Sequence, residues 1–226
     1  MFACEHISIE LMGDKGAFLA VDDVSVHASP HEIVDIIGPS GAGKSTFLHA
    51  LALLIPRKTG SIFYKNVAVE QYGPQDWRRR VALVQQKPAL MAGTIEDNLL
   101  TPWHLRIHRA DTAPSCEVMA ELMKLAGLEE IALSRDIAKL SVGQQARVAF
   151  MRTVLTDPDV LLLDEVDAAL DAQSTHYIGE LTTLFAQKGG IVLRVRHKVD
   201  DERACKRLVF NQGKAELETP VRGDGQ

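Results

Sequence analysis

The chain has 226 residues, of which 46% are hydrophobic, 24% are charged and only 5% are aromatic. This length suits one domain with a sizeable hydrophobic core, and the composition excludes fibrous, disordered and disulfide-rich small proteins. The 25 basic and 30 acidic residues give a net charge of −5, which argues against a broad basic surface and against nucleic acid as a partner.

Two short apolar runs predict central strands of a parallel sheet. Ile33–Ile37 ends at a glycine, and residues 160–163 end at two acidic residues. Such runs are typical of strands buried on both faces, and their alternation with helical patterns is typical of α/β proteins. Residues 61–64 are also rich in strand-forming side chains, so we expect an antiparallel β flap beside the parallel core.

Residues 38–46 read GPSGAGKST and match the phosphate-binding loop G-x-x-x-x-G-K-[ST], with a predicted strand before them and a helix after them. In this motif the loop amides and the helix N-terminus face phosphate oxygens, the lysine reaches the β- and γ-phosphates, and the hydroxyl binds Mg²⁺. We therefore predict a nucleoside triphosphate site formed by Gly38, Pro39, Ser40, Gly41, Ala42, Gly43, Lys44, Ser45 and Thr46.

The middle of the chain has helical apolar spacing, as where Val118, Leu122 and Leu125 recur every three or four residues. We predict a single domain with a core lobe of about residues 1–87 and 156–226 and an inserted helical sub-lobe of about residues 88–155. Within that sub-lobe, Ser141 and Gln144 form a capping box that begins a helix. The amino end of such a helix can accept an anion.

Asp164 and Glu165 follow the second apolar run directly. Ionised carboxylates at the end of a buried strand are costly unless they bind something. In a chain with a phosphate-binding loop, we expect Asp164 to hold Mg²⁺, directly or through water. We expect Glu165 to polarise the water that attacks the γ-phosphate.

These motifs together resemble those of the ABC-type ATPases. Residues 140–144 read LSVGQ, which differs from the family signature LSGGQ only at Val142. The resemblance covers nearly the whole chain. It implies an α/β fold with a P-loop NTPase core, in which a mostly parallel sheet carries an antiparallel β flap and an inserted helical subdomain, and it implies ATP and Mg²⁺ as cofactors.

The resemblance also assigns roles to single residues. Gln86 is similar to the glutamine that touches Mg²⁺ and links the ATP site to the helical lobe, with Gln85 as the weaker choice. His197 resembles the switch histidine that contacts the γ-phosphate. Residues 165–171 resemble the D-loop, in which Asp171 makes an inter-subunit contact.

In this family the signature closes over ATP held by a second subunit, so Ser141, Gly143 and Gln144 are implied to bind the partner's nucleotide in a head-to-tail homodimer. We expect no signal peptide, and no run approaches the ~18 apolar residues of a spanning helix. The resemblance therefore implies a cytoplasmic subunit on the inner face of the cell membrane, bound to a separate integral-membrane permease. Residues 88–99 resemble the groove that receives the permease's coupling helix.

The cargo stays open. Residues 97–100, followed by Pro102, Trp103 and Arg106, resemble the Fet-type class proposed to export iron, and phosphate, amino acids and lipoproteins are the alternatives. Two other functions also stay open. One is a soluble ABC ATPase that acts on DNA or ribosomes. The other is an ATP clamp with little turnover, since Val142 and Ala168 depart from the family pattern, whereas Glu165 favours hydrolysis.

Three further observations leave alternatives. The aromatic residue on which the family stacks adenine falls near Lys15, and Phe18 is the available aromatic side chain, although we expect it to face the core. Arg194 and Arg196 are unusual in a strand, so either they pair with carboxylates or that strand is less buried. His104 and His108 have a helical metal-binding spacing, but no third ligand is evident, so we expect no metal there.

Overall fold

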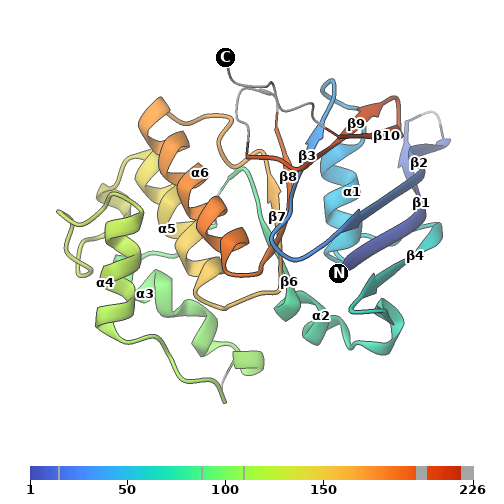
Figure 1. Cartoon of the computed structure of the whole chain (residues 1–226). Coiled ribbons are helices and arrows are strands. Elements are labelled where there is room, and N and C mark those ends of the chain that lie inside the picture. The colour runs from blue at the N-terminus through green and yellow to red at the C-terminus, as the bar shows by residue number, and fades with distance from the viewer. Residues whose placement is uncertain (15, 88, 109, 197–202, 220–226) are drawn as a thin grey trace.

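The computed structural model describes residues 1–14, 16–87, 89–108, 110–196 and 203–219. Its centre is a six-stranded sheet built from β10 (Lys214–Glu218), β9 (Lys206–Asn211), β3 (Ile33–Ile37), β8 (Ile191–Val195), β7 (Val160–Asp164) and β6 (Val81–Val84), in that order. All pairings from β9 to β6 are parallel, and β10 pairs antiparallel with β9 at the edge (Figure 1). The two apolar runs of the sequence are therefore confirmed as central strands.

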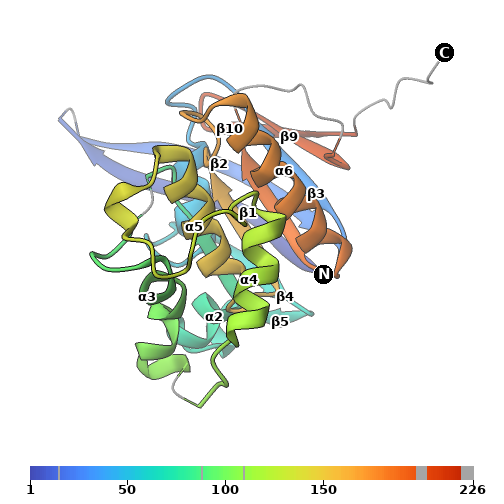
Figure 2. The ribbon, with the colours of Figure 1, turned by 90° about the vertical axis from the view of Figure 1, so that its left-hand side faces the viewer.

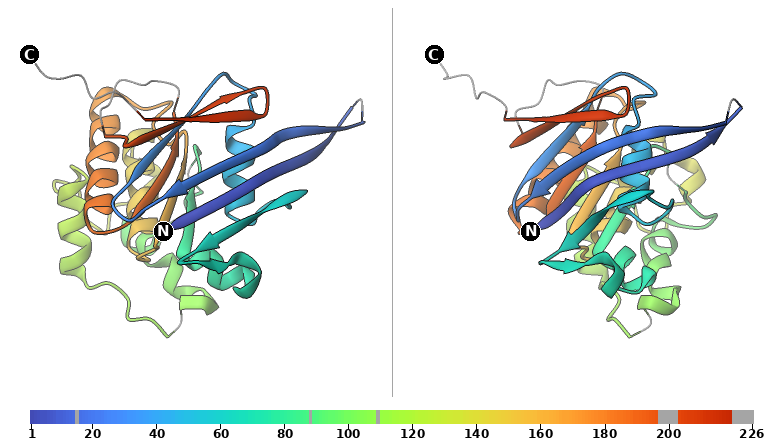
Figure 3. Two further views of the ribbon diagram at one scale, coloured as in Figure 1. Left: turned by 45° about the vertical axis from the view of Figure 1, so that its right-hand side comes forward. Right: turned by 90° about the vertical axis from the view of Figure 1, so that its right-hand side faces the viewer.

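A second sheet is entirely antiparallel, which confirms the expected β flap. It consists of β2 (Gly16–Ala28), β1 (Phe2–Gly13), β4 (Thr59–Tyr64) and β5 (Val67–Ala68), in that order. The flap is larger than the sequence indicated, because β1 and β2 form a long hairpin that extends beyond the rest of the molecule (Figure 3).

The α-helices are α1 (Lys44–Leu51), α2 (Pro74–Arg80), α3 (Ile95–Leu100), α4 (Cys116–Leu125), α5 (Val142–Val154) and α6 (Ala172–Gln187). Short 3₁₀ turns cover η1 (Val69–Gln71), η2 (Thr101–His104), η3 (Arg106–His108) and η4 (Ile137–Lys139). Helices α4, α5 and α6 gather on one side of the central sheet (Figure 2). Among the residues that the structure describes, no helix is both long enough and apolar enough to cross a membrane.

The central sheet separates two hydrophobic clusters. Val34 and Ile36 of β3 pack with α1 and the antiparallel sheet, whereas Leu161 and Leu163 of β7 pack with α3, α4, α5 and α6. This division follows from the alternation of side chains along a strand. Because β3, β6, β7 and β8 run parallel, the residues that follow them meet at one edge of the sheet, where ligands bind in open α/β sheets.

Candidate functional site

The glycine loop lies between the end of β3 and the start of α1, and two of its glycines are required by the backbone. Gly38 has φ 144° and Gly43 has φ 101°, values that favour glycine. A side chain at Gly43 would also collide with the carbonyl oxygen of Ala20, and one at Gly38 with that of Phe210. The loop conformation therefore depends on glycine at both positions.

Lys44 is the first residue of α1, and its side chain is buried against the loop. Its ammonium group donates hydrogen bonds to the carbonyl oxygens of Gly38, at 2.8 Å, and Pro39, at 2.9 Å. The first amides of a helix have no partners within the helix, so they can bind an anion. A fixed cation and these amides are together the groups that can bind a phosphate.

Ser45 and Asp164 meet although 119 positions separate them in the chain. The Ser45 hydroxyl donates a hydrogen bond to Asp164 Oδ1 at 2.7 Å. Asp164 is the last residue of β7, and its side chain is only 11% exposed. A hydroxyl and a carboxylate oxygen beside a phosphate site are the donors that Mg²⁺ takes together with substrate phosphates. The residues present therefore fit that ion.

Sequence reasoning missed a third side chain at this point, His49. Its Nε2 lies 3.7 Å from Asp164 Oδ2, and His49 stands one helical turn after Ser45 on α1. Residues four apart share a helix face, so the spacing from Ser45 was a signal that could have found it.

Glu165 follows Asp164 with a left-handed backbone, φ 51°. Its carbonyl oxygen accepts a hydrogen bond from the Ala168 amide at 3.1 Å, which closes a turn at the sheet edge. A positive φ is uncommon for a residue with a side chain, and it persists where the surroundings hold it in place.

Gln86 lies in a bend just past β6, with an exposed side chain. Strand β6 pairs Val84 with Leu163 of β7, so Gln86 and Asp164 lie at the same sheet edge. Gln85, rather than Gln86, lines a cavity of about 270 Å³ formed by β6, the segment after α1 and α5. Two residues singled out from the sequence, Lys15 and His197, lie outside the described residues.

The predicted capping box begins α5. The Gln144 amide donates to Ser141 Oγ at 3.2 Å, and the Ser141 amide donates to Gln144 Oε1 at 2.9 Å. Val142 is the first helical residue and is 64% exposed, so this position does not need the positive φ that glycine allows. Gly143 does need to be small, because a side chain there would collide with Ser174 at the start of α6.

Asp171 caps α6 instead of standing free at the end of the D-loop-like segment. Its Oδ1 accepts a hydrogen bond from the Ser174 amide at 2.8 Å, and its Oδ2 accepts one from the Ser174 hydroxyl at 2.8 Å. Both hydrogen bonds lower the pKa of Asp171, and the bond from the Ser174 amide has the larger effect. Asp171 therefore stays ionised at neutral pH.

Both unusual arginines pair with carboxylates, and β8 is buried along its whole length. The guanidinium of Arg194 binds Asp35 on the adjacent β3, and that of Arg196 binds Asp167 in the segment after β7. The first of the two alternatives stated for these residues is thus confirmed.

Phe18 does not face the core, so that expectation was wrong. It lies 52% exposed on β2, opposite Leu11 of β1, near the tip of the hairpin. Strand β2 also approaches the glycine loop, because the Ala20 carbonyl lies beside Gly43. The ring is therefore accessible on the strand that flanks the phosphate site.

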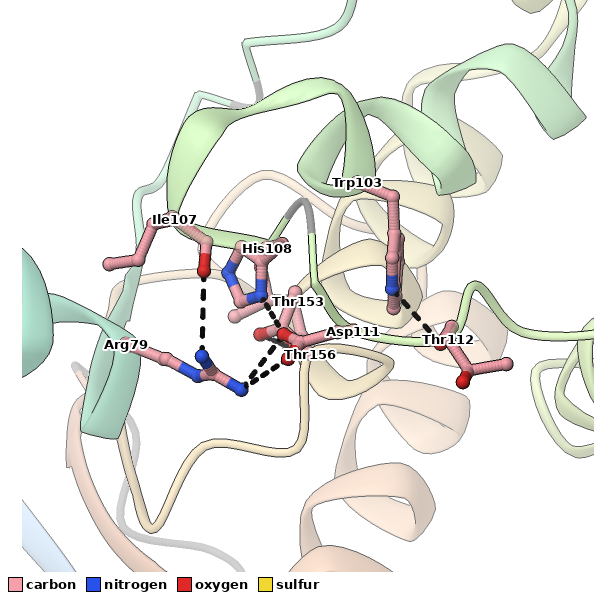
Figure 4. A network of polar contacts seen from close by, with 8 residues as sticks. All are labelled: Arg79, Trp103, Ile107, His108, Asp111, Thr112, Thr153 and Thr156. Carbon is pink, nitrogen blue, oxygen red and sulfur yellow. Dashed lines mark hydrogen bonds and ion pairs between the residues drawn. The ribbon is translucent and has the colours of Figure 1, made fainter.

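The pair His104 and His108 does not share a helix face, because the two residues belong to separate 3₁₀ turns, η2 and η3. His108 hydrogen-bonds Asp111 at 2.9 Å, Arg79 also binds Asp111, and the Trp103 ring lies beside His108 (Figure 4). The described part of the chain contains no cluster of three or more metal-ligating side chains of His, Cys, Asp or Glu. His108 is thus a hydrogen-bonded structural residue.

A strand, a glycine loop whose carbonyls accept from Lys44, and a helix whose Ser45 hydroxyl donates to Asp164 define a P-loop nucleotide-binding protein. Residues 21–168 match the family model described as ABC transporter. The chain belongs to the ABC transporter family and is an ABC ATPase, the ATP-driven cassette of a transporter.

Similar proteins agree with this assignment. The probable iron export ATP-binding protein FetA of Escherichia coli (strain K12) is 33% identical over 178 residues, which cover 78% of this chain and 77% of that protein. The methionine import ATP-binding protein MetN of Sodalis glossinidius (strain morsitans) is 33% identical over 94% of this chain, which spans only 63% of MetN. The chain spans only half of another relative, the protein STAR1 of Oryza sativa subsp. japonica, at 39% identity over 78% of this chain.

Among solved structures, the dimeric structure of MJ0796, a bacterial ABC transporter cassette, superposes with a TM-score of 0.83 at 25% identity. The match covers 97% of this chain and 98% of that one. A post-hydrolysis dimer of the same cassette, bound to ADP and Pi, superposes with the same TM-score and identity.

Proposed function

We propose that this chain binds ATP and Mg²⁺ as one half of a homodimer, and that its hydrolysis of ATP drives a separate integral-membrane permease. The contact of Ser45 with Asp164 carries the proposal, because it joins the loop that would hold the phosphates to the carboxylate that would share the metal ion. The two dimeric structures of the MJ0796 cassette, one of them with ADP and Pi, support the same reading.

The residues of one chain have different roles at the ATP site. The backbone N–H groups of residues 38–46 other than Pro39, together with the ammonium of Lys44, would hold the β- and γ-phosphates, while Ser45, Asp164 and Gln86 would hold Mg²⁺. Bound Mg²⁺ neutralises charge that develops on the phosphates. Glu165 accepts a proton from the attacking water as general base, and His197 contacts the γ-phosphate.

The second subunit completes each site. Helices α1 and α5 pack in different hydrophobic clusters on opposite faces of the central sheet, so the signature is remote from the glycine loop of its own chain (Figure 1). Its capped amino end presents Ser141, Gly143 and Gln144, which we assign to the partner's ATP. Dimer closure thus requires nucleotide, because the phosphates lie between the two surfaces.

The cavity of about 270 Å³ beside the bend after β6 supports a docking site for the permease. Gln85, Lys87 and Ala89 line it from that bend, Arg152 lines it from α5, and Leu54, 47% exposed, stands at its rim after α1. A permease segment inserted there would sense movement of the bend that carries Gln86. We infer that the dimer docks on the permease at the cytoplasmic face of the membrane.

We propose iron export as the transport reaction, on the similarity to FetA, whose name describes a probable iron exporter. Import of an amino acid is the alternative, on the similarity to MetN. The site on this chain binds ATP and not the cargo, whichever molecule is transported. The identity of the permease would therefore decide the cargo.

ATPase assays on the purified protein and on Glu165→Gln test the hydrolytic role. We expect the substitution to lower kcat at least ~100-fold, since it removes the base and keeps the shape. The matched control is Glu121→Gln on the exposed surface of α4. Turnover by Glu165→Gln equal to that of the control would refute the assignment. Recovery of the tagged protein only with ribosomes or DNA, and never with a membrane permease, would refute the transport role.

A further inference from the structure

An ion pair fixes the turn that follows β7. Arg196 Nε lies 3.1 Å and Nη2 3.0 Å from Asp167 Oδ2, and these side chains are only 10% and 19% exposed. Two donors on one carboxylate oxygen, largely shielded from water, make a strong charge-assisted contact. The turn is therefore joined to the end of β8, to which it is not adjacent in sequence.

Strand register explains why Arg196 can reach this turn. Strands β7 and β8 are parallel neighbours, and Asp164 pairs with Val195. The residue that follows β7 is Glu165, and the residue that follows β8 is Arg196. Arg196 thus starts level with Glu165, and its long side chain spans the distance to Asp167, two residues further along the turn.

The backbone at Glu165 needs such support. Its φ of 51° lies in the left-handed region, which is strained for a residue with a side chain. The bond from the Ala168 amide to the Glu165 carbonyl closes the turn, and the buried side chain of Val166 anchors it to the core. The Leu170 amide donates a hydrogen bond to the Asp167 carbonyl oxygen at 3.3 Å, which holds the backbone of Asp167 within the turn. The ion pair with Arg196 joins the Asp167 side chain to the end of β8.

We propose that the Asp167–Arg196 ion pair positions the Glu165 carboxylate to accept a proton from the water that attacks ATP, by locking the turn 165–168 against the end of β8. Asp167 and Arg196 are positioning residues and do not touch the reacting atoms. This inference rests on the role of Glu165 in the proposed function. It adds that the contact governs the chemical step and leaves nucleotide affinity unchanged.

Steady-state ATPase kinetics of Asp167→Asn and Arg196→Gln test this inference. We expect each substitution to lower kcat about tenfold while KM for ATP stays within about twofold, because the phosphate-binding loop is untouched. The double variant should be no slower than either single one, since both remove the same contact. The conservative Asp167→Glu, which keeps the charge, should regain most of the lost kcat.

Asp111→Asn is the matched control. Asp111 also pairs with an arginine, Arg79, but that pair does not include the turn 165–168 or the end of β8. Its kcat should equal that of the unchanged protein. If Asp167→Asn folds poorly, as judged by thermal melting, Arg196→Gln supplies the same comparison from the other side of the ion pair. The inference is overturned if kcat of both Asp167→Asn and Arg196→Gln lies within twofold of the control. It is also overturned if KM for ATP rises as much as kcat falls.

Glu165→Gln is measured in the same experiment to separate two failures. Full turnover by Glu165→Gln overturns the general-base assignment and the positioning role with it. An inactive Glu165→Gln beside a fully active Asp167→Asn overturns only the positioning role. Inactive Glu165→Gln beside a slow Asp167→Asn with unchanged KM supports both.

Discussion

The ion pair between Asp35 and Arg194 lies in the middle of the central sheet, and removing one partner should destabilise the fold strongly. The Asp35 side chain is fully buried and that of Arg194 is 6% exposed. In the parallel register, Asp35 stands between Arg194 on β8 and Arg207 on β9. The Asp35 carboxylate therefore pairs with the Arg194 guanidinium with little access to water.

The size of the effect follows from desolvation. Breaking a buried ion pair by deleting one member costs roughly 3 to 5 kcal/mol, because a buried charge loses its compensation. Asp35→Ala leaves the Arg194 guanidinium buried without that carboxylate. Replacing both partners by apolar side chains, as in Asp35→Val with Arg194→Leu, is often neutral. We expect that double variant to lie within about 2 kcal/mol of the unchanged protein, since it leaves neither charge of the pair buried alone.

Equilibrium unfolding in urea measures these differences. With a slope of about 3 kcal/mol per molar, a loss of about 4 kcal/mol lowers the midpoint by about 1.3 M for Asp35→Ala. The double variant should restore most of that shift. A loss below about 1 kcal/mol for the single variant, or a double variant that loses the sum of both single changes, would refute the reasoning.

Three further outcomes follow from the site. Ser141→Ala should lower the free energy of unfolding by about 1 kcal/mol through loss of the helix cap, and an unchanged melting temperature would contradict this. Phe18→Ala should raise KM for ATP about fivefold by loss of adenine stacking, worth about 1 kcal/mol, with little change in stability because the ring is half exposed. An unchanged KM would exclude Phe18 as the stacking residue. Lys44→Ala should weaken ATP binding at least about tenfold in a fluorescent-nucleotide titration, and intact binding would refute its role.

The motifs were readable from the sequence because each depends on local chemistry. A glycine loop between a strand and a helix, a serine three residues before a glutamine, and an acidic pair after an apolar run are all short patterns with one physical reading. The loop at residues 38–46, the cap at Ser141 and the strand ending at Asp164 are found in the structure as those patterns predict.

Features that depend on which face of an element is buried were harder to predict. The spacing of Val118, Leu122 and Leu125 correctly indicated α4, yet Met119 and Met123 face the core, and Val118 and Leu125 are each 48% exposed. Several helical stripes fit one amphipathic sequence, and only packing against α6 and α5 selects one. The exposure of Phe18 has the same origin, because the long β1–β2 hairpin extends past the core that it was expected to enter.

The sequence by itself determined the chemistry of this protein: a phosphate-binding loop with Lys44 and Ser45, an acidic strand end, a capped signature helix and the family that these define. Only the tertiary structure decided which distant residues meet. The contacts of Ser45 with Asp164, Arg194 with Asp35 and Arg196 with Asp167 arise from the order and register of parallel strands. That order is set by long-range packing of the whole chain, so no local pattern contains it.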